Sequence, residues 1–270
     1  MDKPFANEPT SVRPAAVAGQ FYPGDPTELR RTIEGFLSQV RSGGASSPKA
    51  IIAPHAGYRF AGPVAASAYA RFAPVRSVIQ RIVLIGPSHF VPFEGLAVSS
   101  ANAFATPLGV VPVDVDVVRQ ICSLSQVGIL DKAHAREHSL EVQLPFLQVV
   151  LGEFSIVPLI VGDATDTEVA GVIDALWNGP ATRFVISSDL SHYHDDITAK
   201  ELDSFTSQAI EQLRPEVIGE EDACGRIPIR GLLRAARRHH LHGETIALRN
   251  SGDAAGPLPE VVGYGAFAFE

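Results

Sequence analysis

Apolar residues along this chain gather in short runs, which are separated by longer amphipathic stretches. Runs that end at glycine or proline predict strands buried on both faces, and apolar positions three or four residues apart predict helices. The predicted strands cover residues 50–53, 81–85, 154–161, 183–187, 244–249 and 261–269. The predicted helices cover residues 27–41, 63–72, 114–125, 139–151, 167–177, 197–213 and 229–239.

The alternation of strands and helices predicts an α/β domain, with a mainly parallel or mixed central sheet flanked by helices. Residues 1–26 are rich in proline, glycine and turn-forming residues, so we expect an irregular lead-in there. A chain of 270 residues lies within the size range of one domain. We therefore expect a single domain over residues 1–270.

Composition and charge narrow the classes of function. A net charge of −8 argues against a nucleic-acid partner, because phosphate contacts need clustered lysine and arginine. The densest basic group, Arg234, Arg237 and Arg238, fits the polar face of one helix. No apolar run reaches the roughly 20 residues of a membrane helix. Two cysteines and an N-terminus without an apolar signal sequence lead us to expect a protein of the reducing cytoplasm.

Three predicted strands lead directly into polar residues that can bind a ligand. His55, His89, and Asp189 with His192 follow the first, second and fourth strands. Ligands of open parallel sheets bind beyond the carboxyl ends of the strands, and neutral imidazole is a frequent metal ligand. One such histidine could merely cap a strand. Three at matching strand ends favour a metal or catalytic site at one edge of the sheet.

The two cysteines occupy different settings. Cys224 comes just before a predicted helix, where the helix dipole lowers the pKa of a thiol and favours a thiolate ligand. It could equally be a small buried apolar residue. Cys122 lies within a predicted helix, on an apolar face with Val118 and Ile121, so we expect it in the core.

The segment from His134 to His138 matches the pattern H-x-x-E-H of inverted zinc proteases, with Glu137 as the base. A protease of this kind needs a third protein ligand, and no later carboxylate stands out as one. A second interpretation places Glu137, His138 and Glu141 at the start of a helix that faces the histidine edge, with His138 as an acid or base. A solvated helix start is the third interpretation.

Several motifs together resemble the Memo family, whose bacterial and archaeal members are often called AmmeMemoRadiSam system protein B. The resemblance runs from residue 13 to residue 264. The matching segments are Arg13-Pro-Ala, Gly19-Gln-Phe-Tyr-Pro, Ala53-Pro-His-Ala-Gly-Tyr58, Gly62, Gly86-Pro-Ser-His89, Thr106-Pro-Leu-Gly109, Glu137-His-Ser-Leu-Glu141, Leu144-Pro145, Ser187-Ser-Asp-Leu-Ser-His192, Ala223-Cys-Gly225 with Pro228, and Gly263-Tyr264.

The resemblance implies a fold like that of the LigB-like class III extradiol dioxygenases, which are non-haem iron enzymes. It implies a metal site at His55, His89 and Cys224, holding iron(II) or copper in preference to zinc. By analogy with the dioxygenases, His192 and His138 would act as acid and base. Cys224 stands where those enzymes have a carboxylate ligand, so the resemblance does not carry ring cleavage over to this chain.

The leading hypothesis is therefore a metal-dependent redox protein of the oxidoreductase type. Asp189 and Glu141 would orient the imidazoles. The alternative is a non-enzymatic module whose cleft binds a metal, a small molecule or a peptide. We expect the cleft to be lined by Tyr58, Ser88 and Phe90, and a recognition surface would use the aromatic residues Tyr58, Phe60, Phe90 and Phe93. The family resemblance also implies a functional link to radical SAM and AMMECR-type proteins.

Overall fold

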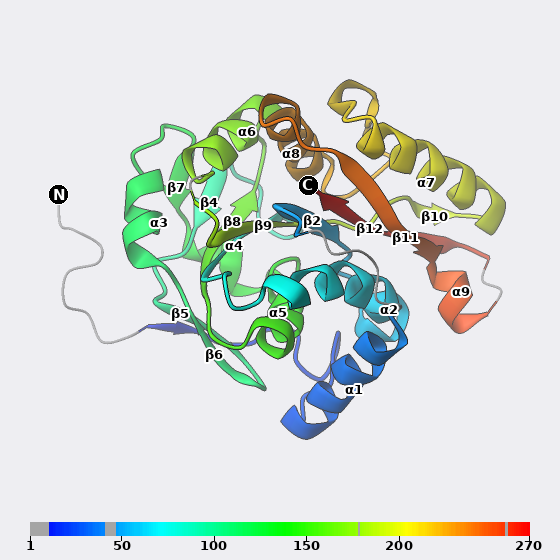
Figure 1. The fold of residues 1–270 in the computed structure, drawn as a ribbon, viewed down its shortest axis with the longest axis horizontal. Coiled ribbons are helices and arrows are strands. Elements are labelled where there is room, and N and C mark those ends of the chain that lie inside the picture. Colours follow the sequence, from blue (N-terminus) through cyan, green and yellow to red (C-terminus); the bar gives the residue numbers. More distant parts are fainter. Residues whose placement is uncertain (1–10, 41–46, 178, 257–258) are drawn as a thin grey trace.

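The computed structural model in Figure 1 describes residues 11–40, 47–177, 179–256 and 259–270. Mostly apolar strands that run parallel to one another, and are buried except at the first residues of two of them, form the centre of its main sheet. In spatial order they are β2 (Ala50–Ala53), β9 (Thr182–Ser187), β3 (Arg81–Pro87) and β8 (Ser155–Val161). Because β2 and β3 both flank β9, their carboxyl ends meet at one edge of the sheet.

Antiparallel neighbours extend this sheet on both sides and make it mixed. Beyond β2 come β12 (Val261–Phe269), β11 (Gly243–Asn250) and β10 (His192–His194). Beyond β8 come β4 (Leu96–Val98) and β7 (Val127–Ile129). A smaller sheet consists of β1 (Val12–Arg13), β5 (Ala103–Thr106) and β6 (Gly109–Pro112).

Helices cover both faces of the main sheet (Figure 1). One group contains α8 (Arg226–Arg238), which packs on β3 and β9, and α6 (Asp166–Ala175). The other contains α2 (Tyr58–Tyr69), which packs on β2 and β12, with α1 (Pro26–Gln39) and α5 (Leu144–Leu151). The remaining helices are α3 (Val115–Ile121), α4 (Asp131–Ala135), α7 (Asp196–Glu211) and α9 (Ser251–Ala255). None of the described helices is long and apolar enough to cross a membrane.

The α/β prediction is confirmed, and so are the predicted strands, two of which have the bounds of β2 and β12. The predicted helix 139–151 is wrong in its first turn: a 3-10 turn at Glu141–Gln143 precedes α5. The predicted helix 63–72 starts earlier, because Tyr58 N donates a hydrogen bond to Phe21 O (2.7 Å) and begins α2 there.

The lead-in is also more ordered than expected where the structure describes it. Val12–Arg13 pairs with β5 as a parallel strand, and α1 begins at Pro26. The first ten residues and residue 41, the predicted end of the first helix, lie outside the described residues. Cys122 is the C-cap of α3 and is half-buried: it packs against the core but is not one of the buried core residues that we expected it to join.

Candidate metal centre

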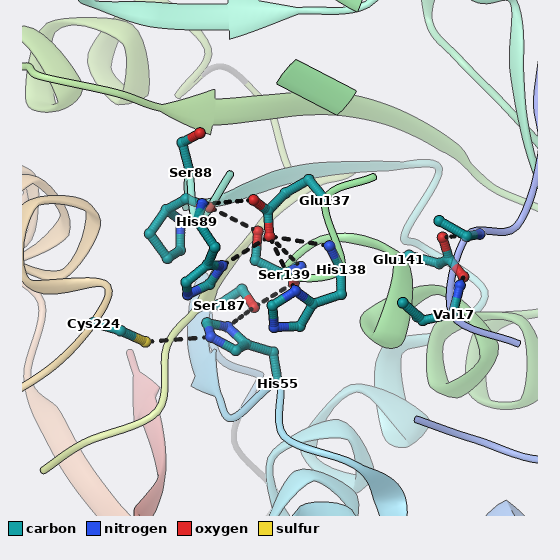
Figure 2. A network of polar contacts seen from close by, with 12 residues as sticks. Val17, His55, Ser88, His89, Glu137, His138, Ser139, Glu141, Ser187 and Cys224 are labelled. Carbon is teal, nitrogen blue, oxygen red and sulfur yellow. Dashed lines mark hydrogen bonds and ion pairs between the residues drawn. The ribbon is translucent and has the colours of Figure 1, made fainter. Parts of the chain in front are cut away.

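Three histidines converge at the edge of the sheet where β2 and β3 end (Figure 2). His55 follows β2, His89 follows β3, and His138 lies on the segment that leads into α5. One nitrogen of each ring lies within 4.8 Å of one nitrogen of the other two. The ring centroids are 4.6 to 5.4 Å apart. Nitrogen donors at this separation could hold one metal ion.

The buried carboxylate of Glu137 fixes His89 in place. It accepts hydrogen bonds from His89 Nδ1 (2.8 Å) and from the main-chain nitrogens of His89 (2.7 Å), His138 (3.0 Å) and Ser139 (3.0 Å). Burial alone would raise the pKa of Glu137, but the hydrogen bonds from His89 and Ser139 and the His89 charge lower it to about 2. When the His89 ring is neutral, the ionised carboxylate holds its proton on Nδ1, so the lone pair is on Nε2.

His55 is the most deeply buried of the three histidines. Its Nδ1 lies 2.9 Å from Ser187 Oγ, and its main-chain nitrogen donates to Asp189 Oδ1 (2.7 Å). Burial, and then the neighbouring imidazoles, lower the pKa of His55 well below its usual value, so the ring is in the neutral form that binds metals. Asp189 therefore holds the main chain of His55 and not, as predicted, an imidazole ring.

His138 and His192 differ in how their rings are held. His138 Nδ1 is buried, and no described residue forms a hydrogen bond with it; Glu137 Oε1 is 3.4 Å away. The Phe21 ring packs against His138, with centroids 4.7 Å apart. His192 Nδ1 donates to Leu190 O (2.7 Å), and His192 lies close enough to lower the pKa of His55. His192 is not part of the cluster of three described above.

Cys224 lies beside His55, with Sγ 3.2 Å from His55 Nε2 (Figure 2). Cys224 is not a member of the group whose ligand atoms all lie within 4.8 Å of one another. The third member of that group, beside His55 and His89, is His138. Burial, and then the charge of Asp189, raise the pKa of the Cys224 thiol to about 12. The sequence led us to expect the opposite shift from the start of α8. Burial outweighs the helix dipole here, so the thiol is protonated at neutral pH.

Glu141 has a different role from the predicted one. Its fully buried carboxylate pairs with Arg13 and accepts from Ala16 N (2.7 Å), Val17 N (2.9 Å) and Tyr22 OH (2.6 Å). Arg13 also donates to two main-chain carbonyls of the segment that precedes Glu141. Glu141 therefore holds residues 13–22 in place and does not orient an imidazole. The carboxylate that orients an imidazole is that of Glu137.

The inverted-protease interpretation of this segment is wrong in its geometry. The short helix α4 ends at Ala135, so His134 and His138 do not share one helix face. His134 is buried away from the cluster, with Nε2 3.0 Å from Ala97 O and its ring packed edge-on against Phe104. The segment turns before His138, and this separates the two histidines.

A cavity of about 460 Å³ opens beside His89 and Cys224. Ser88 and Phe90 line it, and Phe90 is 49% exposed. Arg226, at the start of α8, also lines the cavity and was not singled out from the sequence. The cavity is large enough for a small molecule next to two of the candidate metal ligands.

Tyr58 does not line the cavity. It is buried, its hydroxyl donates to Val142 O (2.6 Å), and its ring packs near Phe146. Phe93 lines the cavity but is half-buried, and Phe60 is half-buried too. The expected exposed aromatic surface is therefore reduced to Phe90, because the other rings are drawn wholly or partly against the core.

Known proteins resemble this chain along nearly its whole length. A model of the family described as Memo-like protein matches residues 13–268. A MEMO1 family protein of Methanopyrus kandleri is 35% identical, over 95% of this chain and 98% of its own length. MEMO1 family proteins of Aeropyrum pernix and Aquifex aeolicus are 37% and 34% identical, each over 94% of this chain and over 98% and 97% of their own lengths. The family match includes all the residues of the histidine cluster.

Proposed function

The chain belongs to the Memo family, and on that premise we propose that its histidine cluster is a redox metal centre of the oxidoreductase type. His55, His89 and Cys224 would bind iron or copper, and His138 and His192 would transfer protons. The observation that carries the proposal is the convergence of three imidazoles at the strand ends, one of them backed by a buried carboxylate.

The donor atoms fit a late first-row transition metal. Imidazole nitrogen and sulfur suit iron, copper and zinc, whereas magnesium and calcium prefer oxygen donors. Glu137 holds His89 in the tautomer and orientation that metal sites commonly use. His55 is neutral and contacts Cys224 through Nε2. These features support a metal ion bound at this edge of the sheet.

The third ligand distinguishes two versions of the centre. Cys224 Sγ lies 3.2 Å from His55 Nε2, and a bound metal would lower the pKa of its thiol and favour the thiolate. His138 is the competing ligand, because its nitrogen belongs to the group within 4.8 Å. We assign proton transfer to His138, because no described residue fixes the proton on its Nδ1.

Bound iron or copper would supply electron transfer to the site. The cavity beside His89 would bind and orient a small molecule, and Phe90 and Arg226 would contact it. His192 has Nδ1 engaged by Leu190 O, so its Nε2 is the atom that would take or give a proton.

The test is anaerobic purification followed by elemental analysis of the wild type and of the double variant His55→Ala/His89→Ala. We expect bound iron or copper in the wild type and its loss in the variant. Equal metal content in both proteins would contradict the proposal. Oxygen consumption with the iron-loaded protein and a panel of catechols, compared with His192→Ala, then tests the redox activity.

A second function is favoured by the exposure of Phe90 at the cavity, where the Arg136 guanidinium lies 5.3 Å from the ring centroid. This pair could bind a peptide without turnover. Calorimetry with candidate peptides, before and after chelation, separates the two functions: binding that survives chelation favours the non-enzymatic module. The cytoplasmic location and the functional link to radical SAM and AMMECR-type proteins stay predictions.

A further inference from the structure

Ser187 is the last residue of β9 and is fully buried between three polar groups (Figure 2 shows two of them). Its Oγ lies 2.5 Å from Ser139 O, 2.8 Å from Gln143 Nε2 and 2.9 Å from His55 Nδ1. A serine hydroxyl has one proton to donate and two lone pairs that accept. These three contacts therefore fill its hydrogen-bonding capacity, and the direction of each one can be derived.

The amide of Gln143 has one orientation that fits its surroundings. One end of the amide faces the carbonyl oxygens of Pro54 (3.0 Å) and Ala53 (3.4 Å), which only accept hydrogen bonds. That end must be the nitrogen, and the oxygen at the other end then accepts from Tyr69 OH (2.7 Å). Because an amide nitrogen cannot accept, Gln143 donates to Ser187 Oγ.

The proton of Ser187 is assigned by the same reasoning. Ser139 O is a carbonyl oxygen, and at 2.5 Å it can face the hydroxyl only as an acceptor. The single proton of Ser187 is used there, so His55 Nδ1 must be the donor in its contact with Ser187 Oγ. The lone pair of His55 is therefore on Nε2, the atom that contacts Cys224 Sγ.

We propose that Ser187 is a positioning residue that fixes the tautomer of His55, with Gln143 holding the Ser187 hydroxyl in place. His89 reaches the same tautomer through Glu137. His55 and His89 thus both have the lone pair on Nε2. A neutral serine hydroxyl holds the proton of His55 on Nδ1, and a charged carboxylate holds that of His89. The consequence for metal affinity rests on the proposed function, whereas the assignment of the proton does not.

The test begins with the metal-free protein. Nitrogen NMR of 15N-histidine-labelled protein distinguishes protonated from unprotonated ring nitrogens, and the His55 signals are assigned by their loss in His55→Ala. We expect a single tautomer in the wild type, with the proton on Nδ1. In Ser187→Ala we expect a mixture of tautomers, because Nδ1–H has lost its acceptor.

A matched control is Ser139→Ala. The Ser139 hydroxyl is equally buried and donates to Pro87 O (2.9 Å), but no hydrogen bond joins it to a described imidazole, and its carbonyl oxygen stays available to Ser187. The control should keep the wild-type tautomer of His55. If Ser187→Ala does not fold, Ser187→Cys replaces the hydroxyl with a weak acceptor of similar shape, and the tautomer mixture is expected there too.

Titration with Co²⁺ then measures the effect on metal binding. Loss of a group that orients a metal ligand typically weakens binding roughly 10–100-fold, and we expect this in Ser187→Ala relative to Ser139→Ala. An unchanged tautomer, or Co²⁺ affinity equal to that of the control, would overturn the positioning role. If the wild type binds no Co²⁺ while the tautomer still depends on Ser187, the proposed function fails and the proton assignment stands.

Discussion

Glu137 and Glu141 are buried carboxylates on one short segment, yet they serve different parts of the molecule. Glu137 accepts hydrogen bonds from the ring and main chain of His89 at the candidate metal centre. Glu141 accepts from Arg13, Tyr22 and two main-chain nitrogens near the start of the chain. The same chemical group therefore orients a ligand in one place and joins distant parts of the chain in the other.

The comparison shows that burial of a carboxylate does not by itself mark a functional residue. What distinguishes the two is the identity of the donors: an imidazole of the cluster for Glu137, and a guanidinium and a phenol from the first described residues for Glu141. Substitutions at the two positions should therefore separate metal affinity from stability.

The largest effect is expected from Glu141→Gln. The change leaves the charge of Arg13 buried and unpaired and turns an amide nitrogen toward groups that can only donate, which costs about 3–5 kcal/mol. Urea unfolding of the wild type and the variant measures the free energy. A loss of unfolding free energy below about 1 kcal/mol would contradict the structural role of Glu141, because its carboxylate would then not hold residues 13–22 in place.

Acid should weaken the fold through Glu137. Its pKa in the folded protein is about 2, below the usual value of about 4.3, so its stabilising contribution is complete above the usual pKa and is lost as the pH falls toward 2. The expected loss is about 3 kcal/mol for this group. Unfolding free energies from pH 6 to pH 2 should show it in the wild type. In Glu137→Gln the drop should be smaller by that amount, and equal slopes would contradict the assignment.

Metal binding should respond to Glu137→Gln. The amide cannot hold His89 Nδ1–H as a carboxylate does, so the affinity should fall roughly 10–100-fold. Competition with a chelator of known affinity measures the change. Glu141→Gln is the control, since no hydrogen bond joins Glu141 to an imidazole ring among the described residues. Affinity that falls equally in both variants, measured on the folded fraction, would remove the distinction between the two carboxylates.

The smallest effect is expected from Tyr22→Phe. The variant removes one of the donors to Glu141 and leaves the others, so we expect a loss of about 1 kcal/mol. Thermal unfolding is sensitive enough to detect it. Metal affinity should not change, and a drop in affinity without a drop in stability would show that the Glu141 contacts reach the metal centre.

The sequence predicts the sheet better than the contacts of the site. Strands such as Ala50–Ala53 and Val261–Phe269 are buried on both faces, so each reads as a nearly continuous apolar run whose bounds are visible in the chain. Short strands such as β4 and β7 are too brief to show a period, and they form because a neighbouring strand pairs with them. Their existence depends on tertiary structure.

At the site, strand-end position is enough to predict that His55 and His89 meet. The roles of Glu137 and Glu141 could not be assigned, because both lie beside His138 in one motif and differ only in partners that fold in from elsewhere. The hydroxyl of Ser187 gives no signal of its own, since its importance comes from groups on two other segments: Ser139 and Gln143 on one, and His55 on the other.

X-ray absorption at the metal edge of the iron- or copper-loaded protein tests the central claim most directly. The account predicts scattering from two imidazoles and one sulfur in the wild type, loss of the sulfur in Cys224→Ser, and loss of specific binding in His55→Ala/His89→Ala. A spectrum without imidazole scattering, or one that the double variant reproduces, would contradict a metal centre at the ends of β2 and β3.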